Sequence, residues 1–120
     1  NKKNLRKIIK IVHSEVKKKM NIFLKKNKKQ KIVILDVPLL LENKINRKGD
    51  ILIFIQANKL DIQKKLKERK NFNSQLMKIF KNIQLPLDYK RKKSQFIIKN
   101  DFTIRTAKKY VKDILKELIK

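Results

Sequence analysis

The apolar run Ile32–Leu35 constrains the fold of this chain more than any other stretch. Four consecutive apolar residues are followed by Asp36, and Pro38 then ends the run. Hydrophobicity that is unbroken, rather than alternating, is typical of a strand that is buried on both faces. Such strands belong to parallel sheets that helices cover on both sides, so the run predicts an α/β fold.

The rest of the chain alternates between further strands and helices. Residues 51–55 and 96–98 are again unbroken and apolar, and both runs predict buried strands. Apolar residues recur at helical spacing in the remaining segments, which predicts helices over residues 2–26, from the N-cap Asn58 to about 70, 74–83, 87–93 and 103–120. Three strands are too few for a complete parallel sheet. We therefore expect an incomplete sheet whose neighbouring strands lie outside this chain, and a first residue other than Met supports that expectation.

Asp36 ends the first predicted strand, at a position where chemistry is expected. Open α/β sheets bind their ligands at the carboxyl ends of their strands. A carboxylate that ends a buried strand also matches the pattern with which phosphoryl-transfer enzymes help to hold magnesium. From the residues alone, the alternative that Asp36 only caps the following turn stays open, because Asp is a common turn residue.

The net charge of +25 suggests an anionic partner. However, Lys, Ile and Asn occur 30, 18 and 11 times, and all three have A/T-rich codons. Only five residues are Arg, whose planar guanidinium binds bases and phosphates through two hydrogen bonds and suits them better than the ammonium group of Lys. The basic excess therefore indicates compositional drift rather than a nucleic-acid surface, and a phosphate-rich small ligand remains compatible with it.

The sequence shows no pattern for several kinds of binding site, or for a membrane span or a signal peptide. The chain has no cysteine, so it has neither a disulfide framework nor a thiolate metal site, which fits a reducing cytoplasm. No apolar run is long enough to span a membrane, and no signal-peptide pattern opens the chain. The single glycine, Gly49, rules out a glycine-rich phosphate loop within these residues.

The octet Leu35–Glu42 resembles the signature of the dephospho-coenzyme A kinases, a family of P-loop kinases, with Leu41 in place of the family's phenylalanine. Further motifs follow in the family's order over essentially the whole chain: His13 without the family's next proline, Lys65 in place of an arginine, Arg69, the Gln84-Leu85-Pro86 lid motif with Lys90, and the strand motif ending in Asn100, in which Gln95 replaces an aspartate. The family's phosphate loop and the catalytic aspartate after it are not among these residues. We therefore expect the larger, C-terminal part of such an enzyme, and we expect that part to be inactive by itself.

The resemblance implies a P-loop kinase-like fold with helical substrate and lid segments. Residues 1–30 would form a substrate-side segment, 31–62 and 94–120 the α/β core, and 63–93 the lid. The family uses ATP and Mg²⁺ to phosphorylate the ribose 3′-hydroxyl of dephospho-coenzyme A. By resemblance, Asp36 is the catalytic residue and holds magnesium through water. The substrate-side residues are His13, Pro38, Leu39, Leu40 and Glu42, and the ATP-side residues are Lys65, Arg69, Gln84, Lys90 and Asn100.

Two alternatives remain beside this interpretation. One is another nucleoside-type P-loop kinase, and the other is a basic α/β module that binds nucleic acid through its phosphates, with steeply salt-dependent affinity. An inactive remnant of a kinase, retained for a structural role, is a third hypothesis.

Overall fold

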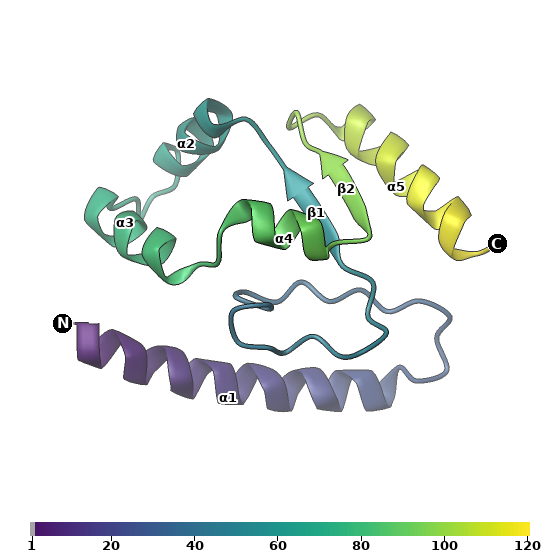
Figure 1. Cartoon of the computed structure of the whole chain (residues 1–120), viewed down its shortest axis with the longest axis horizontal. Coiled ribbons are helices and arrows are strands. Elements are labelled where there is room, and N and C mark those ends of the chain that lie inside the picture. The colour runs from purple at the N-terminus through teal and green to yellow at the C-terminus, as the bar shows by residue number, and fades with distance from the viewer. Residues whose placement is uncertain (1) are drawn as a thin grey trace. The chain divides into compact units, whose positions relative to one another are not determined.

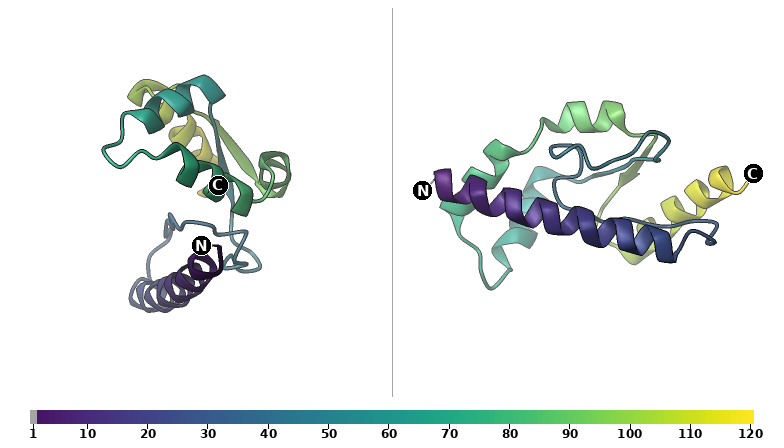
Figure 2. Two further views of the ribbon diagram at one scale, coloured as in Figure 1. Left: turned by 90° about the vertical axis from the view of Figure 1, so that its left-hand side faces the viewer. Right: turned by 90° about the horizontal axis from the view of Figure 1, so that it is seen from below.

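The computed structural model describes residues 2–120 and divides the chain into two compact units, Asn1–Arg47 and Lys48–Lys120. The first unit contains α1 (Lys2–Lys26) followed by irregular backbone and turns. Figure 2 shows α1 as one continuous helix, in agreement with the bounds expected from its periodicity. Met20 of α1 and Ile45 are the buried apolar residues of this unit.

The second unit alternates helices with two strands. Its elements, in order, are β1 (Ile53–Gln56), α2 (Lys59–Lys67), α3 (Ser74–Ile83), α4 (Leu87–Lys93), β2 (Phe96–Lys99) and α5 (Ile104–Leu118). The two strands run parallel, in a register that pairs Ile53 with Phe96 and Gln56 with Lys99, and α5 packs against β2 (Figure 1). The chain is therefore an α/β protein, as expected, with a two-stranded parallel sheet in its described part.

Polar residues define where the helices of this unit begin. The side chain of Asn58 accepts a hydrogen bond from the Leu60 amide at the start of α2, and that of Asn73 accepts from the Gln75 and Leu76 amides at the start of α3. These side chains satisfy amide groups that have no partner inside the helix. The Asn58 cap and the strand at residues 96–98 were expected from the sequence.

The strand predicted at Ile32–Leu35 is not formed, so that prediction is wrong. Residues 32–37 have no regular secondary structure, and the side chain of Ile34 is 82% exposed. A strand exists only when its amide and carbonyl groups pair with a neighbour, however strong its local preference. Within the described residues the sheet consists of β1 and β2 alone, and this run pairs with neither of them.

The prediction that residues 51–55 are buried on both faces is also wrong. Ile51, Ile53 and Ile55 of this run are all more than two-fifths exposed. The reason is the same: β1 pairs with β2 on one side and has no further strand neighbour within residues 2–120. Its hydrophobicity fits a central strand, whereas its observed place is the edge of a small sheet.

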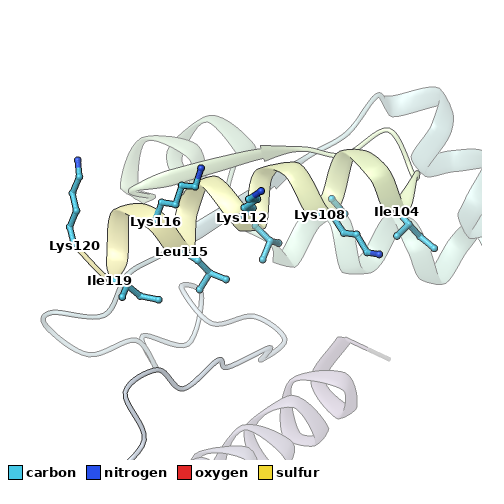
Figure 3. Close-up of a pocket in the computed structure, with 9 residues that line it drawn as sticks. Ile104, Lys108, Lys112, Leu115, Lys116, Ile119 and Lys120 are labelled. Carbon is cyan, nitrogen blue, oxygen red and sulfur yellow. The ribbon is translucent and has the colours of Figure 1, made fainter.

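The apolar stripe predicted for the last helix is divided between two environments. Ile114 is buried, at 7% exposure. Ile104, Val111, Leu115 and Ile119 instead line an open apolar groove along α5, flanked by lysines 108, 112, 116 and 120 (Figure 3). Among the helices of residues 2–120, none combines the length and the apolar character that crossing a membrane requires.

Candidate functional site

In the first unit, a short turn presents the predicted substrate-side residues. The amides of Lys44 and Ile45 donate hydrogen bonds to the carbonyls of Leu41 and Leu40, at 3.2 and 3.0 Å, and Lys44 has a left-handed φ of 53°. This pair of bonds is the Schellman motif, which normally ends a helix. What forms here is one turn that ends immediately, and Ile45 at its end is buried.

The turn sets the exposure of the residues around Asp36. Asp36 and Pro38 are exposed, whereas Leu39, Leu40 and Glu42 are half-buried. Leu39 has a φ of 53°, a conformation that a branched apolar side chain rarely adopts. The local backbone therefore holds Asp36 in solvent at the start of a strained turn, where its carboxylate is accessible to a ligand.

His13 lies on α1 in the same unit, and its side chain is half-buried. Its Nδ1 atom is shielded from solvent and has no hydrogen-bond partner within residues 2–120. A shielded ring nitrogen without a partner carries a desolvation cost, which a bound polar group would remove. This fits the substrate-side role that the resemblance implies for His13.

In the second unit, the carboxyl ends of β1 and β2 meet at one edge of the sheet. The Asn100 amide donates a hydrogen bond to the Gln56 carbonyl at 2.7 Å, which continues the ladder past the two strands. From this edge, β1 leads through Asn58 into α2, and β2 leads through residues 100–103 into α5. Asn100 thus lies at the edge where open α/β sheets bind their ligands.

Phe102 connects two of the predicted ATP-side residues at this edge. The Asn100 side-chain oxygen accepts a hydrogen bond from the Phe102 amide at 2.8 Å. The Lys65 ammonium, from the last turn of α2, lies 5.8 Å from the centre of the Phe102 ring and also pairs with Glu68 at 3.9 Å. Lys65 and Asn100 therefore each contact Phe102, a residue that the sequence did not single out.

Asp101, Thr103 and Thr106 form a hydrogen-bonded cluster in the same loop. The Asp101 carboxylate accepts hydrogen bonds from the Thr103 hydroxyl at 2.6 Å, the Thr106 hydroxyl at 2.7 Å and the Thr103 amide at 2.9 Å. These donors lower the pKa of Asp101, first through the Thr103 side chain and then through Thr106. The cluster fixes the backbone that leads into α5. Its signal in the sequence is an Asp two residues before a Thr at a helix start.

The other predicted ATP-side residues lie elsewhere in the second unit. Arg69 follows α2, Gln84 ends α3, and Lys90 lies half-buried on α4, where its carbonyl accepts from the Ser94 hydroxyl at 2.8 Å. The side chains of Arg69 and Gln84 are exposed and make no hydrogen bond or ion pair with the described residues.

Gln95, which replaces a family aspartate, has a structural task at the opposite end of the strands. The side-chain oxygen of Gln95 accepts a hydrogen bond from the Leu52 backbone amide at 2.6 Å, and the Gln95 backbone amide donates to the Leu52 carbonyl at 2.9 Å. Both bonds extend the pairing of β1 with β2 at their amino ends.

The fit of a magnesium ion can be tested on the acidic residues. Within residues 2–120, no group of three or more His, Cys, Asp or Glu side chains comes together in a way that would hold a metal ion. Mg²⁺ in phosphoryl-transfer enzymes keeps several waters and takes one or two carboxylates together with substrate phosphates. Asp36 is the exposed carboxylate that would hold such an ion through water, with substrate phosphates as the direct ligands.

The comparisons with known proteins point to one family. Residues 1–106 match the family model described as dephospho-CoA kinase. A dephospho-CoA kinase of Wolbachia pipientis wMel is 36% identical over 110 residues, which cover 90% of this chain and 56% of that protein. Those of Bartonella quintana and Bartonella henselae are 32% and 30% identical, over 92% and 97% of this chain and 57% and 60% of the relatives.

No solved structure matches this chain. The chain spans little more than half the length of the curated relatives that it matches. Because the family model covers most of its residues, including the octet Leu35–Glu42 and Asn100, the chain belongs to the dephospho-CoA kinase family.

Proposed function

We propose that this chain is part of a cytoplasmic enzyme that transfers the γ-phosphoryl group of ATP to the 3′-hydroxyl of dephospho-coenzyme A, the last step of coenzyme A biosynthesis. The observation that carries the proposal is the match of residues 1–106 to the dephospho-CoA kinase family. In such transfer the protein mainly positions the reactants and stabilises charge, so each residue is assigned by what it can hold.

The first unit supplies the acceptor side. Leu39 and Leu40 offer half-buried apolar surface to adenine or pantetheine, with Pro38 and Glu42 beside them in the turn. His13 offers its shielded Nδ1 to a polar group of the acceptor. Asp36 orients a magnesium-bound water or the acceptor hydroxyl, because its carboxylate is exposed at the start of this turn. Mg²⁺, when bound, neutralises phosphate charge.

The second unit supplies the ATP side. Asn100 lies at the carboxyl edge of β1 and β2, where a nucleotide would be bound, and Lys65 reaches the neighbouring Phe102 from the last turn of α2. Residues 63–93 act as a lid that brings Arg69, Gln84 and Lys90 to the nucleotide. Arg69 is suited to phosphate, since a guanidinium binds two phosphoryl oxygens at once and stays charged. Its exposed and unpaired side chain leaves it available for this task.

The glycine-rich phosphate loop must come from residues other than these 120, because Gly49 is the single glycine. The isolated chain is therefore expected to transfer no phosphate to dephospho-coenzyme A. Kinase activity of the isolated chain, dependent on Mg²⁺ and ATP, would contradict this part of the proposal.

A chimera tests the function itself. This chain replaces the 110-residue stretch that it matches in the Wolbachia pipientis relative, and phosphorylation of dephospho-coenzyme A is measured. An active chimera supports the proposal, and Asp36→Asn should then lower kcat about 10- to 100-fold, the usual cost of removing a group that orients a metal-bound ligand. Asp113→Asn, which changes an exposed carboxylate on α5, should leave kcat unchanged. A folded but inactive chimera, or equal losses in the two variants, would contradict the proposal.

A further inference from the structure

We propose that Phe102 is a platform on which the purine ring of the nucleotide stacks, at the edge formed by the carboxyl ends of β1 and β2. This inference rests on the proposed function, because it takes that edge as the nucleotide site. It assigns to one side chain the part of the nucleotide that Lys65 and Asn100 do not account for.

The backbone of Phe102 is the first observation. Its φ of 62° lies in the left-handed region, which glycine adopts freely and bulky side chains rarely do. A hydrogen bond from the Phe102 amide to the Asn100 side chain holds this conformation, and the Asp101–Thr103 contacts fix the next residues. An aromatic residue held in a strained conformation by its neighbours is an outlier of the kind that clusters at ligand sites.

The exposure of the ring is the second observation. Phe102 is 40% exposed, although burial of an aromatic ring is one of the largest stabilising contributions available to a small unit. The surrounding structure thus covers Phe102 only in part and leaves two-fifths of it open to solvent at the sheet edge. Bases stack on exposed aromatic rings because every base offers a π-face of similar size.

The chemistry around the ring is the third observation. Lys65 lies over one face of the Phe102 ring, 5.8 Å from its centre, so a base would stack on the other face and the cation would remain near it for phosphate oxygens. Asn100, next but one in the chain, carries an amide group whose nitrogen can donate to a ring nitrogen of a purine. An aromatic face with an amide and a cation in contact with the same residue matches a nucleotide better than an inorganic anion, which has no face to stack.

The test uses the full 120-residue chain and two probes that separate the base from the phosphates. Adenosine is neutral, so the net charge of +25 does not attract it, whereas inorganic tripolyphosphate carries charge and no base. Binding of each probe is measured by NMR titration, with ring-labelled phenylalanine as the reporter. The signal that disappears from the spectrum of Phe102→Tyr is the signal of Phe102.

Phe102→Gly is the informative variant, because glycine relieves the left-handed backbone while it removes the ring. It should weaken adenosine binding about tenfold, the lower part of the usual effect of removing a stacking ring. Tripolyphosphate binding and thermal stability should not fall. Phe102→Tyr should bind adenosine as the original chain does. In the matched control Phe72→Gly, a ring that is likewise 40% exposed is removed from another loop, and adenosine binding should be unchanged.

An upfield shift of the Phe102 ring protons on addition of adenosine, together with the loss in Phe102→Gly alone, supports the proposal. Equal adenosine affinity in Phe102→Gly and the original chain would overturn it while leaving the proposed kinase function intact. Failure of the original chain to bind adenosine at all would overturn it too, and only that result would also count against the ATP side of the proposed function.

Discussion

Replacing Ile114 by alanine is expected to destabilise the unit of residues 48–120 by about 2–4 kcal/mol. Ile114 is the buried residue of α5, 7% exposed, and α5 packs against β2. The substitution removes three methylene equivalents, each of which contributes about 0.8 kcal/mol when buried. The cavity that remains adds a further cost, because its lining relaxes only in part.

The same helix provides a matched control. Ile104→Ala removes the same atoms from a side chain that is 75% exposed, so the expected loss is about 0.5 kcal/mol. Urea unfolding, followed by far-ultraviolet circular dichroism, gives the free energy of unfolding of each variant. Native-state hydrogen exchange of the β2 amides reports on the same unit independently.

Equal losses in the two variants would refute the reasoning, because they would mean that burial of Ile114 does not hold α5 on the sheet. A larger loss for Ile104→Ala would mean that the open face of α5 is the face that packs in solution. If the expected difference is found, α5 anchors the loop of residues 100–103, and with it the edge to which Phe102 and Asn100 belong.

Two further predictions concern backbone features of the two candidate sites. Thr103→Ala removes the side-chain donor that contributes most to the lowered pKa of Asp101, so this pKa should rise toward 3.8 in an NMR titration. The same substitution removes the N-cap of α5, and the lost cap should lower the free energy of unfolding by about 1 kcal/mol. A carboxyl group whose pKa is lowered by folding stabilises the fold at pH values above its unfolded pKa. The contribution of Asp101 should therefore be present above pH 3.8 and be lost as the pH falls through its folded pKa. A Thr103→Ala variant that loses stability on acidification just as the original chain does would contradict this. Lys44→Gly should stabilise the turn by about 0.5–1 kcal/mol in thermal unfolding, because glycine adopts the φ of 53° without strain. Lys28→Gly, at a position whose φ is not positive, should be destabilising, and a gain there would refute the argument.

Local patterns were sufficient to predict the helices, the Asn58 cap and the family. The periodicity of apolar residues predicted α1 over the bounds at which it forms, and Asn58 caps the helix that follows it. Each of these features depends on residues within a few positions of one another, so the local order of side chains is enough to predict it. The octet around Asp36 is equally local, and the family match includes it.

The tertiary structure alone decided which strands pair and which side chains meet. Ile32–Leu35 has the composition of a strand but stays irregular, because a strand needs a hydrogen-bonding neighbour that its own residues cannot supply. Phe102 meets Lys65 only because parallel pairing of β1 with β2 sets residues 100–103 beside the segment that leads into α2, and the course of α2 then carries its last turn to the Phe102 ring. Contacts between residues this far apart depend on sheet register and helix packing, which no local pattern specifies. The sequence therefore determined the helices and the family, and the fold determined the edge at which we propose that the nucleotide binds.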